Sequence, residues 1–557
     1  MEEKVKSALA QAAAAHVSDE ISIELDYPDE RYGDFASNCA IKLANKAEQN
    51  PAELAQKIAA SLKSILPGDI EEENVAGPGF INIRLSDSAL YAAMKEEADR
   101  PLEGQSTVVE FSDPNPFKIL HAGHLYTSVV GDAIANLLSV AGAKVHRVNY
   151  GGDVGLHVGK SLYAMLKFLG GENPDKLDQI EPSKRSQWMS EMYVSGNSAY
   201  DENDEAKAEI VELNQRVYKV QAENDHDSSL AKIYWTTRKW SYEEFERFYA
   251  RLNIHFDKFY PESEVAPIGL NTVKEQLERG VFEQSDGAVV FKGEKYNLHT
   301  RVFINRHGIP TYEGKDIGLA MLKQRDYQMT RSIIITGNEQ EQYMSVVLKA
   351  MSLFAPELAE QTTHLTHGMV RLSGGKKMSS RQGNILKATD VLDAAEVAAK
   401  EVSTEVDPKV VLAAVKYSFL KQRLGGDIIY EPEESVNVLG NSGPYLQYAY
   451  ARANSVLAKA GKQAEANEAM DLNSGERALA LKLSRYSTLI NNAAKELSPH
   501  LLCSYLYDLA QVFNRFYEGN RVLGDPREDI RLYLTATYLN RLKQGLEILG
   551  IEAPQRI

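Results

Sequence analysis

An early segment of this 557-residue chain limits its fold most, because a strand-like run, a turn and a helix-like run follow one another directly. TVVEFS (107–112) has the composition of a buried strand, and Pro114 and Pro116 follow it. Residues 125–140 carry apolar side chains at helical spacing, and VHRVNYGGD (145–153) has the pattern of another strand and turn. This order predicts a nucleotide-binding α/β fold with a parallel sheet.

The segment before this region predicts a separate small domain. Residues 1–66 have mainly helical spacing, and within them residues 35–47 are predicted as one amphipathic helix. GPGFINIRL (77–85) alternates apolar and polar residues after a Gly-Pro-Gly turn, as a strand would. We therefore expect a compact α+β domain over residues 1–104.

Later segments predict the rest of the sheet and a helical end. GAVVF (287–291) and SIIIT (332–336) have strand composition and are expected to return the chain to the parallel sheet. The polar stretch 170–230 predicts a solvated helical insertion in a domain spanning 105–395. Helical spacing dominates residues 396–557, which predicts an all-α C-terminal domain.

Charge and cysteine content exclude several classes of protein. The net charge is −16, which argues against general coating of nucleic acid, although the acid excess lies in the first 400 residues. Cys39 and Cys503 stand far apart without a CxxC pair, so neither a disulfide framework nor a four-thiolate zinc site is expected. No apolar run is long enough to span a membrane, and we expect a cytoplasmic protein without a resident metal site.

The first candidate site is the HAGH sequence, His121 to His124, at the predicted start of a helix. Two imidazoles three residues apart share one helix face, and the helix N-terminus adds unpaired N–H groups that favour anions. Gly123 leaves room for a flat base. Two surface or capping histidines would give the same pattern.

The second candidate site is the loop SGGKKMSSRQGN (373–384). Its glycines, lysines and arginine could close over a triphosphate and stabilise charge on departing pyrophosphate. The same composition also suits a solvated basic turn, so the pair of motifs carries more weight than either one.

Together the two motifs resemble the HIGH and KMSKS signatures of class I aminoacyl-tRNA synthetases, and among these the chain is most similar to the arginyl-tRNA synthetase family. The resemblance rests on GDFASN (33–38), GPGFINIRL (77–85), EFSDPNPFKILHAGH (110–124), GDAIANLL (131–138), TYEGKDI (311–317), HGMV (367–370), KKMSSRQGN (376–384), NSGPYLQYAYAR (441–452), FNRFY (513–517) and EILGIEAPQRI at the end. It implies a Rossmann-type catalytic domain, an N-terminal domain that contacts the tRNA D-loop and a helical anticodon-binding domain.

The residues expected around the substrate suit arginine. A guanidinium is planar and permanently charged, so a selective pocket needs carboxylates and a flat surface. Glu110, Tyr312 and Asp316 meet that need, and Tyr312 and Asp316 share one side if a helix begins there. The resemblance assigns these three to the arginine side chain, and it assigns Asn115, His124 and Gln340 to its backbone groups or the pocket wall.

The phosphate-binding set departs from the class I pattern at one position. Ser380 stands where many class I enzymes have the second lysine of KMSKS, and the resemblance assigns the compensating charge to Lys118. Lys118, His121, His124 and Lys377 are therefore the predicted catalytic residues. The predicted ATP contacts are His121, Gly123, His124, Met369, Val370, Lys377, Met378, Ser379 and Arg381.

Aromatic residues beside polar or basic ones are the expected platforms for unstacked RNA bases. The resemblance assigns Phe80 and Asn82 to the D-loop, and Tyr445, Tyr448 and Arg452 to the anticodon region. Asn514 and Tyr517 are weaker candidates of the same kind. Aromatics at helical spacing also occur in ordinary cores, which is the competing interpretation.

The sequence as a whole predicts ATP-dependent ligation of L-arginine to its cognate tRNA through arginyl-adenylate. Mg²⁺ is expected to bind together with ATP. The expected partners are tRNA(Arg) and L-arginine, and the expected assembly is a monomer. The resemblance further implies that bound tRNA could be needed for adenylate formation. A lysyl or cysteinyl enzyme and a catalytically silent RNA-binding relative remain alternatives, although two cysteines cannot supply the zinc site expected of a cysteinyl enzyme.

Overall fold

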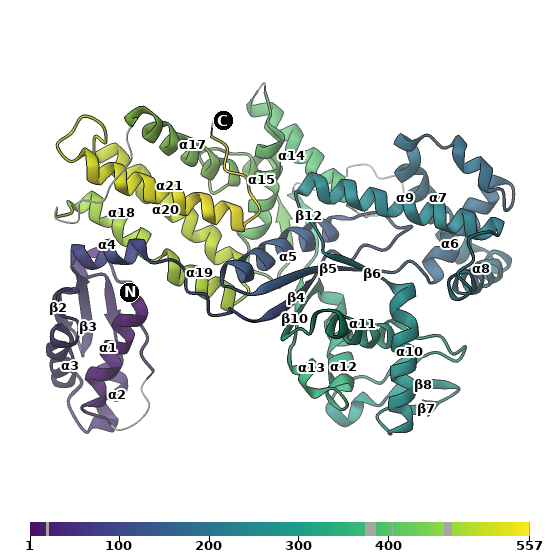
Figure 1. The fold of residues 1–557 in the computed structure, drawn as a ribbon, viewed down its shortest axis with the longest axis horizontal. Helices are drawn as coiled ribbons and strands as arrows, with labels where there is room; N and C mark the ends of the chain where they lie inside the picture. Colours follow the sequence, from purple (N-terminus) through teal and green to yellow (C-terminus); the bar gives the residue numbers. More distant parts are fainter. Residues whose placement is uncertain (18–21, 374–385, 404, 462–470, 556–557) are drawn as a thin grey trace.

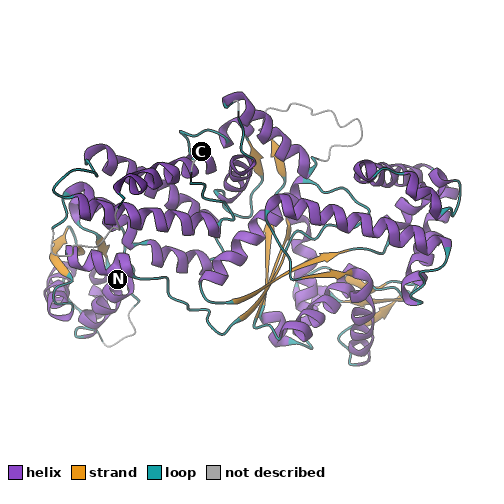
Figure 2. Cartoon of the chain, turned by 45° about the horizontal axis from the view of Figure 1, so that its top comes forward, coloured by secondary structure: helices purple, strands orange, loops and turns teal. Residues whose placement is uncertain are grey.

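The computed structural model describes residues 1–557 except 18–21, 374–385, 404, 462–470 and 556–557. Its N-terminal domain and its insertion helices lie at opposite ends of an elongated molecule (Figure 1). A parallel sheet with helices on both sides occupies the middle (Figure 2). The multidomain α/β plus α architecture predicted from the sequence is confirmed.

The N-terminal domain packs helices against a small antiparallel sheet of order β1-β3-β2. Its elements are α1 (Glu2–Ala14), β1 (Phe35–Ser37), α2 (Cys39–Ala47), α3 (Pro51–Ile65), β2 (Ile70–Ala76), β3 (Phe80–Leu85) and α4 (Asp87–Lys95). The single helix predicted over residues 35–47 is wrong, because residues 35–37 pair as a strand with β3 and the helix starts only at Cys39. Backbone pairing overrides helical spacing over so short a segment.

The catalytic sheet has five parallel strands in the order β11-β10-β4-β5-β6. They are β4 (Ser106–Glu110), β5 (Lys144–Gly151), β6 (Lys258–Pro261), β10 (Arg331–Gly337) and β11 (Thr362–His367). The first strand in sequence, β4, lies at the centre, with later strands added on either side. This is a doubly wound order, so a crevice forms at the carboxyl ends of β4 and β10.

Helix α5 (Ala122–Val140) connects β4 to β5 and carries the HAGH sequence at its start. It is apolar nearly all round and lies between the sheet and the C-terminal helices. Gly131 permits close contact with Phe111, the residue directly after β4, because a Cβ atom at Gly131 would lie only 2.2 Å from the Phe111 ring. The sequence therefore fixes how closely α5 approaches the sheet.

The segment between β5 and β6 is helical, as predicted for residues 170–230, but it is not merely a solvated surface. It contains α6 (Leu156–Leu169), η2 (Pro174–Gln179), η3 (Pro182–Lys184), α7 (Arg185–Glu202), α8 (Asp204–Ala222) and α9 (Ser229–Leu252). Trp188, Leu213 and Val217 are buried in a core shared with α6 and α9. The prediction of a solvated surface followed the polar composition of the segment and did not take account of these apolar helix faces.

The segment between β6 and β10 holds α10 (Glu262–Glu278), β7 (Glu283–Ser285), β8 (Ala288–Phe291), η4 (Gly293–Tyr296), β9 (Arg301–Ile304) and α11 (Tyr312–Tyr327). The prediction that residues 287–291 rejoin the parallel sheet is wrong. They form β8 in a separate antiparallel sheet, β7-β8-β9, where short connections allow antiparallel pairing.

After β10 come η5 (Asn338–Gln340), α12 (Glu341–Ser352) and α13 (Pro356–Glu360), and β12 (Val370–Leu372) later pairs with β13 (Ile428–Tyr430). The helices of the C-terminal part are α14 (Ala388–Val402), α15 (Pro408–Leu420), α16 (Pro432–Ser435), α17 (Gly443–Ala460), α18 (Ser474–Ser484), α19 (Tyr486–Lys495), α20 (Pro499–Gly519) and α21 (Glu528–Ile548). In the described part of the chain, no helix has the length and apolarity to cross a membrane.

Candidate active site and tRNA-facing surfaces

The candidate active site lies at the carboxyl edge of the parallel sheet. β4 ends at Glu110, and the loop after it leads to His121 at the start of α5. β10 ends at Gly337, and Gln340 follows in η5 with an exposed side chain. Connections that leave β4 and β10 in opposite directions create the crevice in which ligands bind in such sheets.

The two imidazoles of HAGH accept backbone N–H groups at the start of α5 and form a capping box. His121 Nδ1 accepts the Gly123 N–H at 3.1 Å, and His124 Nδ1 accepts the His121 N–H at 3.1 Å. Their rings stack with centroids 3.7 Å apart. Because each Nδ1 is an acceptor, a neutral ring carries its proton on Nε2, which leaves one N–H donor for a ligand.

Burial and neighbouring positive charge keep both rings neutral. Desolvation lowers the pKa of His124 well below 6.5, and His121 and Lys118 lower it further. Desolvation also lowers the pKa of His121, although the Glu339 carboxylate opposes that shift. The pair therefore offers neutral hydrogen-bond donors to an anion at physiological pH.

Both ends of the KMSSR loop lie beside HAGH, although its predicted residues Lys377, Met378, Ser379, Ser380 and Arg381 are outside the described residues. After the loop, the Leu386 carbonyl accepts the Ala122 N–H at 2.8 Å. Before it, the His367 ring packs 4.8 Å from the Tyr126 ring of α5, measured between centroids. Two stretches far apart in sequence thus converge on one helix N-terminus.

The predicted ATP contacts Met369 and Val370 lie on the stretch that leads into this loop. The Met369 N–H donates to Asp427 Oδ1 at 2.9 Å, and its side chain is 60% exposed. Val370 opens β12. An exposed methionine beside a helix N-terminus is a suitable surface for a purine base.

Lys118 faces the same region from the loop before α5. Its ammonium lies 5.8 Å from the centre of the Tyr193 ring, and within the described ranges it forms no ion pair. Desolvation lowers the pKa of Lys118, and the nearby charge of Lys160 adds to the shift. An unpaired, partly desolvated cation is a strong site for phosphate oxygens.

The carboxylates predicted for arginine do come together, but they are not equivalent. Glu110 is only 4% exposed and accepts a hydrogen bond from the buried Lys323 ammonium at 2.5 Å. Asp316 forms no ion pair or hydrogen bond with another described residue. Burial and then the Glu110 charge raise the pKa of Asp316 well above its usual range. Asp316 is therefore the carboxylate that lacks a cation.

Sequence reasoning missed three polar residues of this pocket. Lys323 neutralises Glu110, the Asp113 carboxylate accepts the Tyr150 N–H at 2.8 Å, and the buried Tyr150 hydroxyl has no partner in the described structure. Asp113 lies just after the carboxyl end of β4, and Tyr150 lies at the carboxyl end of β5, positions that could have marked them. A single sequence carries no comparable signal for Lys323.

The remaining arginine candidates lie around these carboxylates. Tyr312 begins α11, as its spacing from Asp316 requires, and its ring is 62% exposed with the Lys315 ammonium 5.5 Å from its centre. Lys315 is itself paired with the buried Glu262. Asn115 Oδ1 accepts the Gly152 N–H at 2.8 Å, which fixes its amide at the sheet edge.

The N-terminal tRNA candidates occupy the outer face of β3. Phe80, Asn82 and Arg84 alternate with the buried Ile81 and Ile83, as a strand requires. The Phe80 side chain is 37% exposed, whereas Asn82 is 8% exposed between β1 and β2. Phe80 can therefore stack on a base, and Asn82 offers little more than an amide edge.

The C-terminal candidates line a groove of about 740 Å³ between α17 and the end of α20. Its walls include Tyr448, Arg452, Lys459, Tyr517 and Arg521. Tyr448 is 50% exposed, and the Arg452 guanidinium lies 4.8 Å from the centre of the Tyr517 ring. Tyr445 is not among these lining residues: its hydroxyl accepts from Asn514 at 3.0 Å and its ring packs against Tyr507.

Three family models match consecutive parts of the chain. They are the tRNA synthetases class I (R) catalytic domain at residues 87–431, the DALR anticodon binding domain at 446–557 and the arginyl tRNA synthetase N terminal domain at 1–85. The chain belongs to the arginyl-tRNA synthetase family. It is an enzyme that ligates arginine to tRNA with ATP, through an arginyl-adenylate intermediate.

Similar proteins cover the chain almost completely. The arginine–tRNA ligase of Flavobacterium psychrophilum is 30% identical over 92% of this chain and 90% of its own length. The arginyl-tRNA synthetase of Thermus thermophilus matches with a TM-score of 0.82, 25% identity and full coverage of both chains. The fold is also that of the Plasmodium falciparum arginyl-tRNA synthetase, with a TM-score of 0.79 and 21% identity, covering 100% of this chain and 99% of that one.

Proposed function

We propose that the crevice between HAGH and the KMSSR loop holds ATP for adenylate formation. The arginine carboxylate oxygen attacks the α-phosphorus, and the bond to the bridging oxygen breaks to release pyrophosphate. His121 and His124 donate from Nε2 to phosphate oxygens, while Lys118 and Lys377 stabilise the negative charge that shifts to pyrophosphate. The observation that carries this proposal is the backbone pairing of residues 120–122 with residues 386–388.

The adenosine part of ATP is assigned to the other predicted contacts. Gly123 leaves space beside the His121 ring, and Met369 and Val370 supply an apolar surface. Met378, Ser379 and Arg381 are kept in the proposed ATP set on the resemblance alone.

The proposed arginine pocket uses Asp316 as the main partner of the guanidinium. Its lack of an ion pair among the described residues supports this role, whereas Glu110 already has a cation in Lys323 and would line the pocket beside Asp316. Tyr312 would cover the planar group, with Asn115, His124 and Gln340 toward the amino and carboxylate end. In this arrangement the carboxylate of the bound arginine faces the ATP crevice.

The proposed tRNA surfaces are Phe80 with Asn82, and the groove at Tyr448 and Arg452, with Tyr445 holding that groove's wall. After adenylate formation, a hydroxyl of the terminal ribose of tRNA attacks the arginyl carbonyl and AMP leaves. We assign these steps to domains bounded at residues 1–104, 105–395 and 396–557. The family membership supports tRNA(Arg) as the RNA partner.

The enzyme is proposed to act as a cytoplasmic monomer with Mg²⁺ bound to ATP. Within the described residues, no group of three or more His, Cys, Asp or Glu side chains could hold a metal ion. Phosphate oxygens would therefore be the main ligands of Mg²⁺.

The test is amino-acid-dependent exchange of pyrophosphate into ATP across all twenty amino acids, with and without total tRNA. Exchange with arginine alone is expected. Exchange with lysine instead would reject the pocket assignment, and no exchange under any condition would point to a silent relative.

A further inference from the structure

The first turn of α18 contains two consecutive charged residues whose side chains leave the helix toward different domains. Glu476 points into the C-terminal helical bundle, where its side chain is fully buried. Arg477 points to the N-terminal domain, and its side chain is 10% exposed. Figure 1 shows α18 directly beside α4, at the junction of the two domains.

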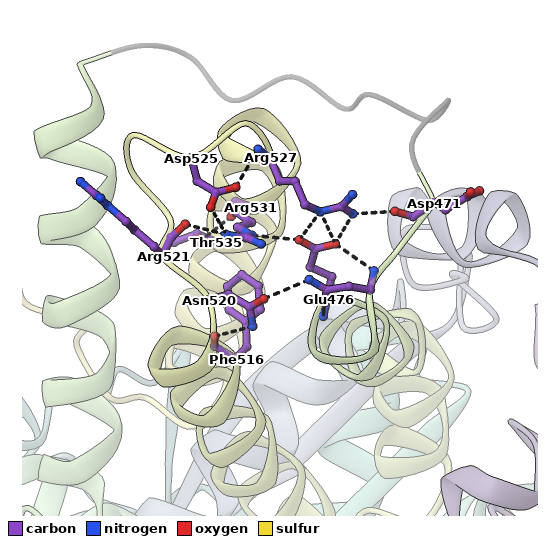
Figure 3. Close-up of polar contacts among 10 residues, drawn as sticks. Asp471, Glu476, Phe516, Asn520, Arg521, Asp525, Arg527, Arg531 and Thr535 are labelled. Atoms are coloured by element: carbon purple, nitrogen blue, oxygen red, sulfur yellow. Dashed lines mark hydrogen bonds and ion pairs between the residues drawn. The ribbon is translucent and has the colours of Figure 1, made fainter.

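Glu476 is the centre of a buried ion network (Figure 3). Its carboxylate accepts from Arg527 Nε at 2.9 Å and from Arg531 Nε at 2.9 Å. Arg531 Nη1 in turn donates to the Arg521 carbonyl at 2.7 Å and pairs with Asp525 at 3.2 Å. A buried carboxylate requires such partners, so the network holds the connection between α20 and α21 in one conformation.

That connection forms one wall of the groove proposed for the anticodon region. Asn520, Arg521, Val522 and Leu523 line the groove opposite Tyr448 and Arg452. Asn473, which caps α18, donates from its amide to Asn520 Oδ1 at 3.0 Å. Glu476 therefore acts on the shape of the groove without touching it.

Arg477 ties the same helical turn to the strand that carries Phe80. Its guanidinium donates to Asp34 Oδ2 at 2.6 Å, to the Leu85 carbonyl at 2.9 Å and to Asp87 Oδ1 at 2.6 Å. Leu85 ends β3, the strand on which Phe80 is the first residue. Asp34 Oδ2 also accepts the Leu85 N–H at 2.7 Å, so the contact reaches two segments of the N-terminal domain.

We propose that Glu476 and Arg477 are positioning residues that hold the two tRNA-facing surfaces at a fixed spacing. This rests on the proposed function, which places RNA at Phe80 and in the Tyr448 groove. Two weak sites held at the correct spacing bind one ligand more tightly than either does alone, often by a hundredfold or more. Loosening Arg477 reduces this gain, whereas loosening Glu476 weakens the groove itself.

The test compares binding of a tRNA(Arg) transcript with binding of its isolated anticodon stem–loop. Arg477→Ala is expected to weaken full-length tRNA binding by roughly tenfold or more and to leave stem–loop binding within about twofold. Glu476→Gln is expected to weaken both. In aminoacylation, Arg477→Ala raises KM for tRNA while KM values for arginine and ATP stay unchanged.

Control variants separate positioning from general loss of structure. Lys482→Ala removes an ion pair of the same helix, with Asp508 at 3.1 Å, which does not cross the domain junction, and should leave both affinities unchanged. Asp87→Asn removes the charge of one Arg477 partner, which also accepts the Leu472 N–H at 2.8 Å, and should give an intermediate loss if Arg477→Ala does not fold.

Three outcomes reject the proposal, and the last of them is distinguishable from the other two. Unchanged tRNA affinity in folded Arg477→Ala and Asp87→Asn, or an equal loss of stem–loop binding, rejects the positioning role alone. A wild-type chain that binds tRNA but not the stem–loop, with no effect of Phe80→Ala on tRNA binding, rejects the surfaces in the proposed function and the positioning role with them.

Discussion

The backbone N–H of Ala122 donates a hydrogen bond to the carbonyl oxygen of Leu386 at 2.8 Å, and the Ala388 N–H returns one to Leu120 at 3.0 Å. The HAGH turn is thus joined by main-chain bonds to the segment that follows the KMSSR loop. Because these bonds need no particular side chain, the relative position of residues 120–122 and 386–388 is set by the backbone.

Replacement of Lys118 tests the proposed source of positive charge. Lys118→Ala should lower kcat for pyrophosphate exchange by at least tenfold, about 1.4 kcal/mol of transition-state stabilisation, because Lys118 is a partly desolvated cation whose charge acts on both imidazoles of HAGH. Lys160→Ala is the matched control, since the Lys160 ammonium is already bound to Asn197 at 2.8 Å. Equal losses in the two variants, or unchanged turnover in Lys118→Ala, would contradict the assignment.

Replacement of Asp316 tests the arginine pocket. Asp316→Asn should raise KM for arginine by roughly tenfold or more, since a charge-assisted hydrogen bond contributes about 1.5–3 kcal/mol, while KM for ATP stays unchanged. Glu313→Gln lies on the same helix but is paired with Arg301 at 3.5 Å, and should have little effect. Steady-state kinetics with arginine as the varied substrate measures both, and a larger effect in Glu313→Gln would reverse the assignment.

The pH dependence should separate the carboxylates from the imidazoles. Burial and the Glu110 charge raise the pKa of Asp316, so arginine binding, which needs the ionised form, weakens as pH falls through that raised value. The pKa values of His121 and His124 are lowered, so both rings stay neutral at 6.5 and above. We expect kcat/KM for arginine to fall as the pH is lowered, whereas kcat should show no titration near pH 6.5. Asp316→Asn should remove much of the fall in kcat/KM. A change of kcat with a midpoint near pH 6.5 would contradict neutral imidazoles.

Replacement of Gly131 tests the packing of α5 on the sheet. A Cβ atom there would lie 2.2 Å from the Phe111 ring, so Gly131→Ala should lower the free energy of unfolding by about 1–3 kcal/mol through overpacking. Gly519→Ala is the control, because nothing lies within 4 Å of the added Cβ atom. Thermal unfolding of both variants measures the difference, and equal Tm values would show that α5 shifts without cost.

Much of the fold follows from local patterns, and the exceptions have physical causes. The strand before HAGH was predictable from its apolar, β-branched composition, and the helix after it is long enough for its periodicity to show. Residues 35–37 were expected to be helical, and the strand at 288–291 was predicted but its sheet was not, because so short a strand takes its partner from tertiary contacts that a local pattern does not contain.

The site divides in the same way. HAGH and the acids before and after it carry recognisable spacing, whereas Lys323 is a lysine on an ordinary helix until folding brings it to Glu110. Arg477 gives no signal either, because its partners Asp34 and Asp87 belong to another domain. Pairings between distant segments are the part of the site that one sequence does not reveal.

The strand order has a consequence for synthesis on the ribosome. β4 gains its neighbour β5 soon after it emerges, but its other edge is covered only by β10, after more than two hundred further residues. At about 5–20 residues per second this interval is roughly ten to forty seconds. During that time the edge of β4 that later pairs with β10 has unpaired backbone N–H and C=O groups. Such an edge can pair with strands of other chains until β10 covers it.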